Sequence, residues 1–171
     1  MNQLLDIAPF NWPAIGISLL CGVVIGIERQ LRGKPVGIRT ASLITLGTYI
    51  FTAAALSVMS DESDPSRIIG QVVTGVGFLG AGVMLSKDGV VIGVTSAATI
   101  WVLAAIGVVI AVATPFTAVK LSLIVIAILH GVEFLETYSA ALTRGVHSRY
   151  RTWRGTQDDQ SDCQKQNGAD D

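Results

Sequence analysis

The chain alternates long apolar runs with short charged gaps, and the sign of the charge changes from one gap to the next. The gap at 28–40 is basic, whereas the gap at 60–66 is acidic. A run of about 20 apolar residues is long enough to cross roughly 30 Å of hydrocarbon as a helix. Loops on the cytoplasmic side carry the excess of Lys and Arg. The pattern therefore predicts a membrane protein with the 28–40 gap inside and the 60–66 gap outside.

Apolar segments that fit this pattern are each expected to form one transmembrane helix. They cover approximately residues 10–27, 36–59, 67–85, 91–113 and 116–135. Five crossings place the N-terminus outside and the C-terminus inside, so the basic cluster after the last segment also lies inside. The sequence thus predicts an all-α, polytopic helical membrane protein with about five transmembrane helices.

The two ends of the chain differ from this apolar block in composition. Residues 1–9 contain no Lys or Arg, unlike a signal peptide, and are expected in the periplasm. Residues 10–135 form the predicted transmembrane domain. Residues 136–171 are a polar cytoplasmic tail with too few apolar residues to fold alone. Basic and aromatic residues over 136–154 favour a short amphipathic helix on the inner leaflet.

Charged and polar residues near the ends of the segments form the first candidate site. Glu28 and Arg29 close the first segment, and Arg39 opens the second at the same predicted face. Because an ion at membrane depth is costly unless it is paired, we expect Glu28 to pair with Arg39. Arg67 and Gln71 lie one turn apart at the outer face, where they either meet the acidic gap or cap a helix. The predicted cluster consists of Glu28, Arg29, Lys34, Arg39, Thr40, Arg67 and Gln71, and it either forms a functional site or only fixes the topology.

The third segment is rich in glycine, and the fourth is rich in small residues. Small residues let helix backbones approach closely in a bilayer, where helix association depends on such packing. We therefore expect these two segments to pack as a tight hairpin. The residues expected at that contact are Gly70, Gly75, Gly77, Gly80, Gly82, Gly93 and Ala97. The alternative is a flexible or partly unwound helix whose backbone lines a ligand site.

A candidate metal-binding face lies on the fifth segment, where His130, Glu133 and Glu136 recur at i, i+3 and i+6. Hard ions such as Mg²⁺ prefer carboxylates to imidazole, so only the two glutamates suit magnesium. The same pattern is also typical of side chains that reach from a helix end to the interface. No cofactor is expected beyond Mg²⁺ as a ligand or signal. No constellation of Ser, His and Asp or of Cys and His is visible, so we do not expect an enzyme.

Three ordered blocks between residues 16 and 112 carry a family resemblance. They are residues 26–30 (GIERQ) with 34–40 (KPVGIRT), residues 67–82 (RIIGQVVTGVGFLGAG), and residues 93–101 (GVTSAATIW). In this order and spacing they resemble the MgtC/SapB family of membrane proteins. Two departures stand out: Gln30 occupies a position where many members carry Glu, and residues 136–171 do not match the soluble C-terminal domain of the longer members.

The resemblance implies a small bacterial inner-membrane protein associated with growth at low magnesium and with virulence inside host phagocytes. Its implied partners are the lipid bilayer and either another inner-membrane protein or a second copy of the chain, whereas nucleic acid is not expected. We expect a regulatory or interaction role, because the segments are rich in glycine and lack a row of charges that would line a pore. The alternative is a transporter or channel for Mg²⁺ or another small solute.

Overall fold

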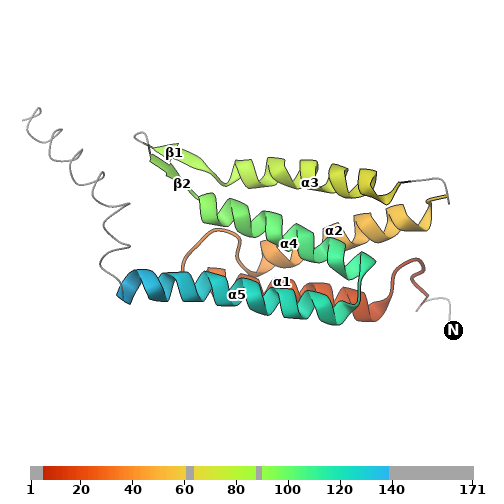
Figure 1. The fold of residues 1–171 in the computed structure, drawn as a ribbon, viewed down its shortest axis with the longest axis horizontal. Coiled ribbons are helices and arrows are strands. Elements are labelled where there is room, and N and C mark those ends of the chain that lie inside the picture. Colours follow the sequence, from red (N-terminus) through yellow and green to blue (C-terminus); the bar gives the residue numbers. More distant parts are fainter. Residues whose placement is uncertain (1–5, 61–63, 88–89, 139–171) are drawn as a thin grey trace, which may run out of the picture. The chain divides into compact units, whose positions relative to one another are not determined.

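The computed structural model describes residues 6–60, 64–87 and 90–138. In this part of the chain the helices are α1 (Trp12–Leu31), α2 (Ile38–Ser57), α3 (Pro65–Gly82), α4 (Val94–Val112) and α5 (Pro115–Tyr138) (Figure 1). A short antiparallel hairpin of β1 (Leu85–Lys87) and β2 (Val90–Ile92) joins α3 to α4. The predicted helical class with five helices is confirmed, whereas the sequence predicted only a turn where the hairpin lies.

By length and composition, α1, α2 and α4 are able to cross a membrane. The helix α3, which carries Arg67, Gln71 and several glycines, is not among these three candidate spans. The apolar part of α5 is limited to Pro115–Gly131. The insertion of α3 and α5 and the direction in which the chain crosses therefore stay predictions.

The loop between α1 and α2 turns at Gly33, just after the C-cap Arg32. This glycine has a φ of 62°, in the left-handed region where other residues are strained. The N–H groups of Gly33 and Lys34 donate to the carbonyls of Gln30 (3.1 Å) and Arg29 (3.0 Å). Both bonds are those of a Schellman motif, which satisfies the last carbonyls of the helix. The turn thereby fixes where α1 ends and α2 can begin.

The start of α3 depends on a local cap. Asp64 accepts hydrogen bonds from the backbone N–H and the hydroxyl of Ser66, at 2.9 and 2.6 Å. Pro65 follows at the first helical position, where its missing N–H costs nothing. A side chain at the N-cap satisfies one of the N–H groups that have no partner within a helix. Asp64 and Pro65 therefore form a local start signal for α3.

The core of the N-terminal unit, which extends to Ile126, lies where α1, α2 and α4 pack together. Its fully buried large side chains include Ile25, Tyr49, Ile100 and Leu103. The N-terminal half of α5 also contributes, because Ala118 is completely buried. These apolar residues come from the helices that are long and apolar enough to cross a membrane, together with the first turns of α5.

Glycines set the distance between α1 and α2. A Cβ atom added at Gly22 would lie 2.5 Å from the Cα of Ser42, and one added at Gly26 would lie 2.5 Å from the Cα of Ile38. No side chain fits at either position, because the obstacle is backbone. Gly22 and Gly26 are four residues apart, which is the spacing of small residues at close helix crossings.

A third glycine, Gly107, plays the same part between α4 and α2. A Cβ atom there would lie 2.6 Å from the carbonyl oxygen of Thr45 and 2.7 Å from the Cβ of Thr48. By contrast, only Val76 and Gly80 are buried in α3, and Phe78 is 81 % exposed. The three-helix core is therefore tightly packed, whereas α3 leaves most of its surface open.

Candidate functional site

The three-helix core contains a buried arginine at the C-terminal end of α1. Arg29 is 4 % exposed, and its Nη2 donates to the hydroxyl of Ser96 at 2.8 Å. Ser96 lies in the first turn of α4, so this bond ties the end of α1 to the start of α4. The Nε of Arg29 has no hydrogen-bond partner among the described residues. Because a buried charge is costly without acceptors, the stability of the folded protein should depend strongly on the bond from Arg29 to Ser96.

The residue beside it, Glu28, pairs within its own helix. One of its carboxylate oxygens lies 2.6 Å from the Nε of Arg32, one turn further along α1, and the Glu28 side chain is 9 % exposed. The contact is an ion pair rather than an aligned hydrogen bond, since neither Glu28 oxygen has a hydrogen-bond partner in the described part of the chain. The predicted Glu28–Arg39 pair is wrong, because the i,i+4 neighbour takes the carboxylate.

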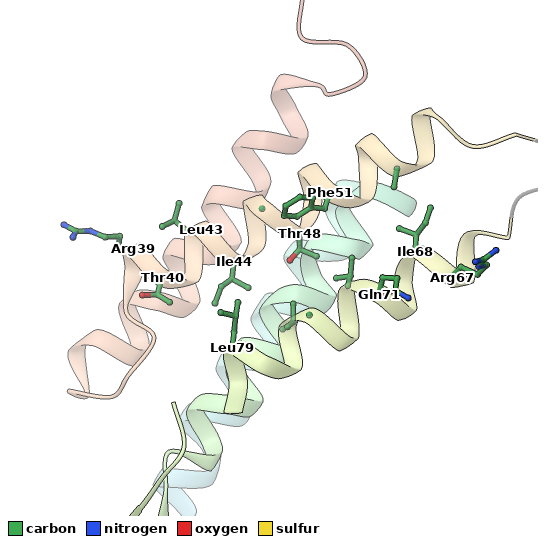
Figure 2. A pocket seen from close by; sticks show the side chains of 15 residues that line it. Arg39, Thr40, Leu43, Ile44, Thr48, Phe51, Arg67, Ile68, Gln71 and Leu79 are labelled. Atoms are coloured by element: carbon green, nitrogen blue, oxygen red, sulfur yellow. The ribbon is translucent and has the colours of Figure 1, made fainter. Parts of the chain in front are cut away.

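The other predicted cluster residues lie elsewhere. Arg39, Thr40, Arg67 and Gln71 line a groove of about 880 Å³ between α2 and α3 (Figure 2). Lys34 is exposed in the α1–α2 loop and lines neither the groove nor the buried arginine site. The predicted single cluster is therefore divided into a buried site at the end of α1 and an open groove between two other helices.

The groove is apolar along its length and cationic at its ends. Figure 2 shows Arg39 at one end and Arg67 at the other, since α2 and α3 run in opposite directions. Arg39 and Ala55, which both line it, are 16 residues apart, or about 24 Å along a helix. Its apolar walls are formed by Leu43, Ile44, Phe51, Ile68, Val72, Val76 and Leu79. Neither arginine has an ion pair within the described residues.

Glycine widens this groove on both sides. Gly47 of α2 and Gly75 of α3 line it, and a Cβ atom added at either position would meet nothing within 4 Å. The prediction that Gly75 packs α3 against α4 is therefore wrong. It is also wrong for Gly70, Gly77 and Gly82, where an added Cβ atom likewise meets nothing.

Two of the predicted packing residues, Gly80 and Ala97, do bring α3 and α4 together, whereas Gly93 does not. An added Cβ atom at Gly80 would lie 3.5 Å from the carbonyl oxygen of Ala97 and 3.7 Å from its Cβ, which is ordinary contact. Gly93 has a φ of 90°, and the Val83 carbonyl occupies the space that a side chain would need there. It therefore shapes the turn from the hairpin into α4 rather than a contact between helices.

Sequence analysis missed the part played by Gln30. Its side-chain oxygen accepts a hydrogen bond from the N–H of Ile38 at 3.3 Å. The same oxygen would lie 2.9 Å from a Cβ atom added at Gly37. Gly37 is the N-cap of α2 and offers no side-chain acceptor of its own. The amide therefore caps α2 from across the loop. The polar residue one position after Arg29 was a readable signal for such a contact.

The metal-binding face predicted on α5 stays a prediction. The side chains of Glu133 and Glu136 lie outside the described part of the structure, although the helix backbone extends to Tyr138. Among the side chains that are described, no group of three His, Cys, Asp or Glu residues is placed to hold a metal ion.

The fold defines a class: a helical membrane protein whose apolar helices pack together with a buried arginine at one end of their core. Within that class the chain belongs to the MgtC family, whose model matches residues 15–138. The match includes all five helices except the first turn of α1, and it also includes the groove and the buried arginine site.

Curated relatives resemble the chain over a shorter stretch. A protein of Escherichia coli K12 named "Putative magnesium transporter YhiD" is 50% identical over 100 residues, which are 54% of this chain and 46% of that protein. The MgtC proteins of Brucella abortus 2308 and Salmonella typhimurium 14028s are each 42% identical over 91 residues, or 53% of this chain and 38% of theirs. The chain thus spans less than half the length of these relatives. No solved structure matches it.

Proposed function

We propose that the chain is a multi-pass protein of the bacterial inner membrane that regulates another membrane protein by docking α3 against it. The proposed setting is adaptation to low magnesium or survival inside host cells. The family membership supports a role of this kind, and the magnesium link rests on the name of the E. coli relative. The observation that carries the docking role is the open small-residue face of α3.

This face is a ridge formed by Gly70, Thr74, Gly77 and Ala81, called the α3 ridge below. The spacing i, i+4, i+7 and i+11 places all four residues on one side of the helix, and all four are exposed. The Thr74 hydroxyl donates to the carbonyl of Gly70 at 2.9 Å, so the helix satisfies it internally. In a bilayer, a ridge of small residues lets a second helix approach closely.

The electrostatics of the groove oppose the alternative of Mg²⁺ transport through it. Arginine lies at both of its ends, and like charges repel a divalent cation there. By sequence, α1 to α4 contain a single carboxylate, Glu28, which is already paired with Arg32. Magnesium prefers several oxygen ligands and gives up its water reluctantly. The described helices thus favour contact with a partner over a path for the ion.

The test substitutes the ridge in the full chain. In a strain whose growth at low magnesium depends on this protein, Gly77→Leu should abolish growth support while leaving protein levels unchanged, because the bulky side chain blocks a partner helix. The matched control is Gly16→Leu, since an added Cβ atom at Gly16 in α1 also meets nothing within 4 Å. Growth of the Gly77→Leu strain at the wild-type level would exclude the α3 ridge as a docking surface.

A second measurement separates regulation from transport. The purified full chain is reconstituted in liposomes that enclose a Mg²⁺ indicator, with and without a membrane potential. We expect no flux above that of empty liposomes. Saturable Mg²⁺ flux would establish transport and overturn the regulatory proposal.

A further inference from the structure

We propose that the groove between α2 and α3 binds one anionic phospholipid, with the phosphate at Arg39 and an acyl chain along the apolar walls. This inference is separate from the regulatory role. Gly75 and Gln71 line the groove, whereas Gly70 and Gly77 of the α3 ridge do not. A lipid in the groove and a partner helix on the ridge would therefore occupy different sides of α3.

The Arg39 end of the groove has the charge to hold a phosphate. Arg39 is exposed and has no ion pair in the described part of the chain, and the hydroxyl-bearing Thr40 lines the same end. Arg39 also lies in the first turn of α2, where the helix dipole favours an anion. Basic side chains close to a membrane surface attract the anionic lipids of the inner leaflet. This end is therefore complementary to an anionic headgroup.

The Arg67 end is less suited to an anion. Asp64 lies three residues before Arg67 and caps α3, so a carboxylate is already present near that end. A second negative group there would be repelled by it. The proposal therefore assigns the lipid to the leaflet at Arg39.

The apolar walls match the length of one leaflet. Arg39 and Thr48 are nine residues apart, or about 14 Å along α2, which is close to half of the roughly 30 Å hydrocarbon core. Between them, Ile44 of α2 and Leu79 of α3 lie beside each other across the groove (Figure 2). A chain attached to a phosphate at Arg39 would thus lie against apolar side chains as far as the midplane.

The charge pattern favours an anionic lipid over an apolar helix as the occupant. The groove offers about 880 Å³, and its lining is mostly apolar between Arg39 and Arg67. An anionic headgroup with an acyl chain matches both the cationic end and the apolar walls, whereas an apolar helix would leave Arg39 without a counter-ion.

The experiment is native mass spectrometry of the full chain in detergent with added phosphatidylglycerol or phosphatidylcholine. We expect wild type to retain phosphatidylglycerol about fivefold better, the effect of roughly one basic contact with an anionic lipid. Arg39→Ala should lose this preference, and Arg39→Lys should keep it, because the charge remains. Gly75→Leu should reduce retention of both lipids by filling the groove. Its matched control, Gly77→Leu, should retain lipid as wild type does.

Several outcomes would overturn the proposal. Equal retention of the two lipids by wild type, or an unchanged preference in Arg39→Ala, would exclude the headgroup site. Unchanged retention in Gly75→Leu would exclude the groove, and a lipid-free dimer would identify a second copy as the occupant. Identical elution of all variants in detergent serves as the folding control. Because Gly77→Leu tests the regulatory role and Gly75→Leu tests the lipid, either idea can fail alone.

Discussion

Glycine occurs at helical spacing in both α1 and α3, but the two helices use it in opposite ways. Gly22 and Gly26 lie so close to the backbone of α2 that a side chain would collide with it, whereas Gly70 and Gly77 have open space above them. The close contact inside the chain accounts for Gly22 and Gly26 of α1. No such contact accounts for Gly70 and Gly77 of α3 among the described residues. The comparison therefore supports the proposal that a partner docks on α3, where the small residues Gly70 and Gly77 are uncovered.

The largest loss of stability is expected at Gly26, where the backbone of α2 leaves no space for a side chain. Gly26→Leu should lower the free energy of unfolding by roughly 3 kcal/mol, the upper end of the usual cost of overpacking. The cause is the α2 backbone at Ile38, which has no rotamer to change. Titration with a denaturing detergent measures the loss. Gly77→Leu, the equivalent change in α3, should leave the stability within about 0.5 kcal/mol of wild type.

Equal losses in these two variants would break the comparison, because they would show that α3 is packed as tightly as α1. Gly16→Leu supplies a reference for the effect of a leucine at an open position within α1 itself.

A smaller effect should sharpen the comparison at the helix ends. Ser96→Ala removes the one hydrogen bond from buried Arg29 to α4 and should cost about 2 kcal/mol, since such bonds to charged groups contribute roughly 1.5–3 kcal/mol. The same detergent titration measures it. In the Arg29→Met background, Ser96→Ala should cost much less, because no buried charge is left without its acceptor. Additive losses would mean that the two residues stabilise the fold independently.

The smallest effect concerns the end of α3. The hydroxyl and then the backbone N–H of Ser66 hold the pKa of Asp64 below its usual value. A carboxylate of this kind contributes stability above its unfolded pKa of about 3.9 and loses it as the pH falls through the lower folded pKa. Wild type should therefore lose thermal stability below about pH 4 relative to Asp64→Asn, which caps without titrating. If the thermal stability of wild type and of Asp64→Asn changed with pH in the same way, the ionised carboxylate of Asp64 would contribute nothing to stability.

Much of the fold could be predicted because apolar length and charge are local properties of the sequence. The five predicted segments correspond to α1 to α5. The hairpin was missed because its two strands lie at the ends of segments that are apolar enough to read as helix. Of the glycines predicted to pack α3 against α4, Gly80 does so, whereas the closest approaches are at Gly22 and Gly26 of α1, whose four-residue spacing was readable.

The candidate site was harder to predict, because it depends on how neighbouring helices are placed. Glu28 has basic residues both at i+4 and in the next helix, and the nearer Arg32 takes the carboxylate. The sequence placed Arg39 and Arg67 in one candidate cluster but could not show that they lie at opposite ends of one groove. That arrangement follows from the angle and distance between α2 and α3, which local residue patterns do not determine.

The bond between Arg29 and Ser96 also has a consequence for how the protein is made. Its partners are 67 residues apart in sequence. At about 5–20 residues per second, the ribosome needs roughly 3–13 seconds to advance from one to the other. Throughout that interval α1 is complete while its arginine lacks its final acceptor. The nascent chain must therefore keep Arg29 in contact with water or lipid headgroups, and the burial of this charge marks the moment when α4 arrives.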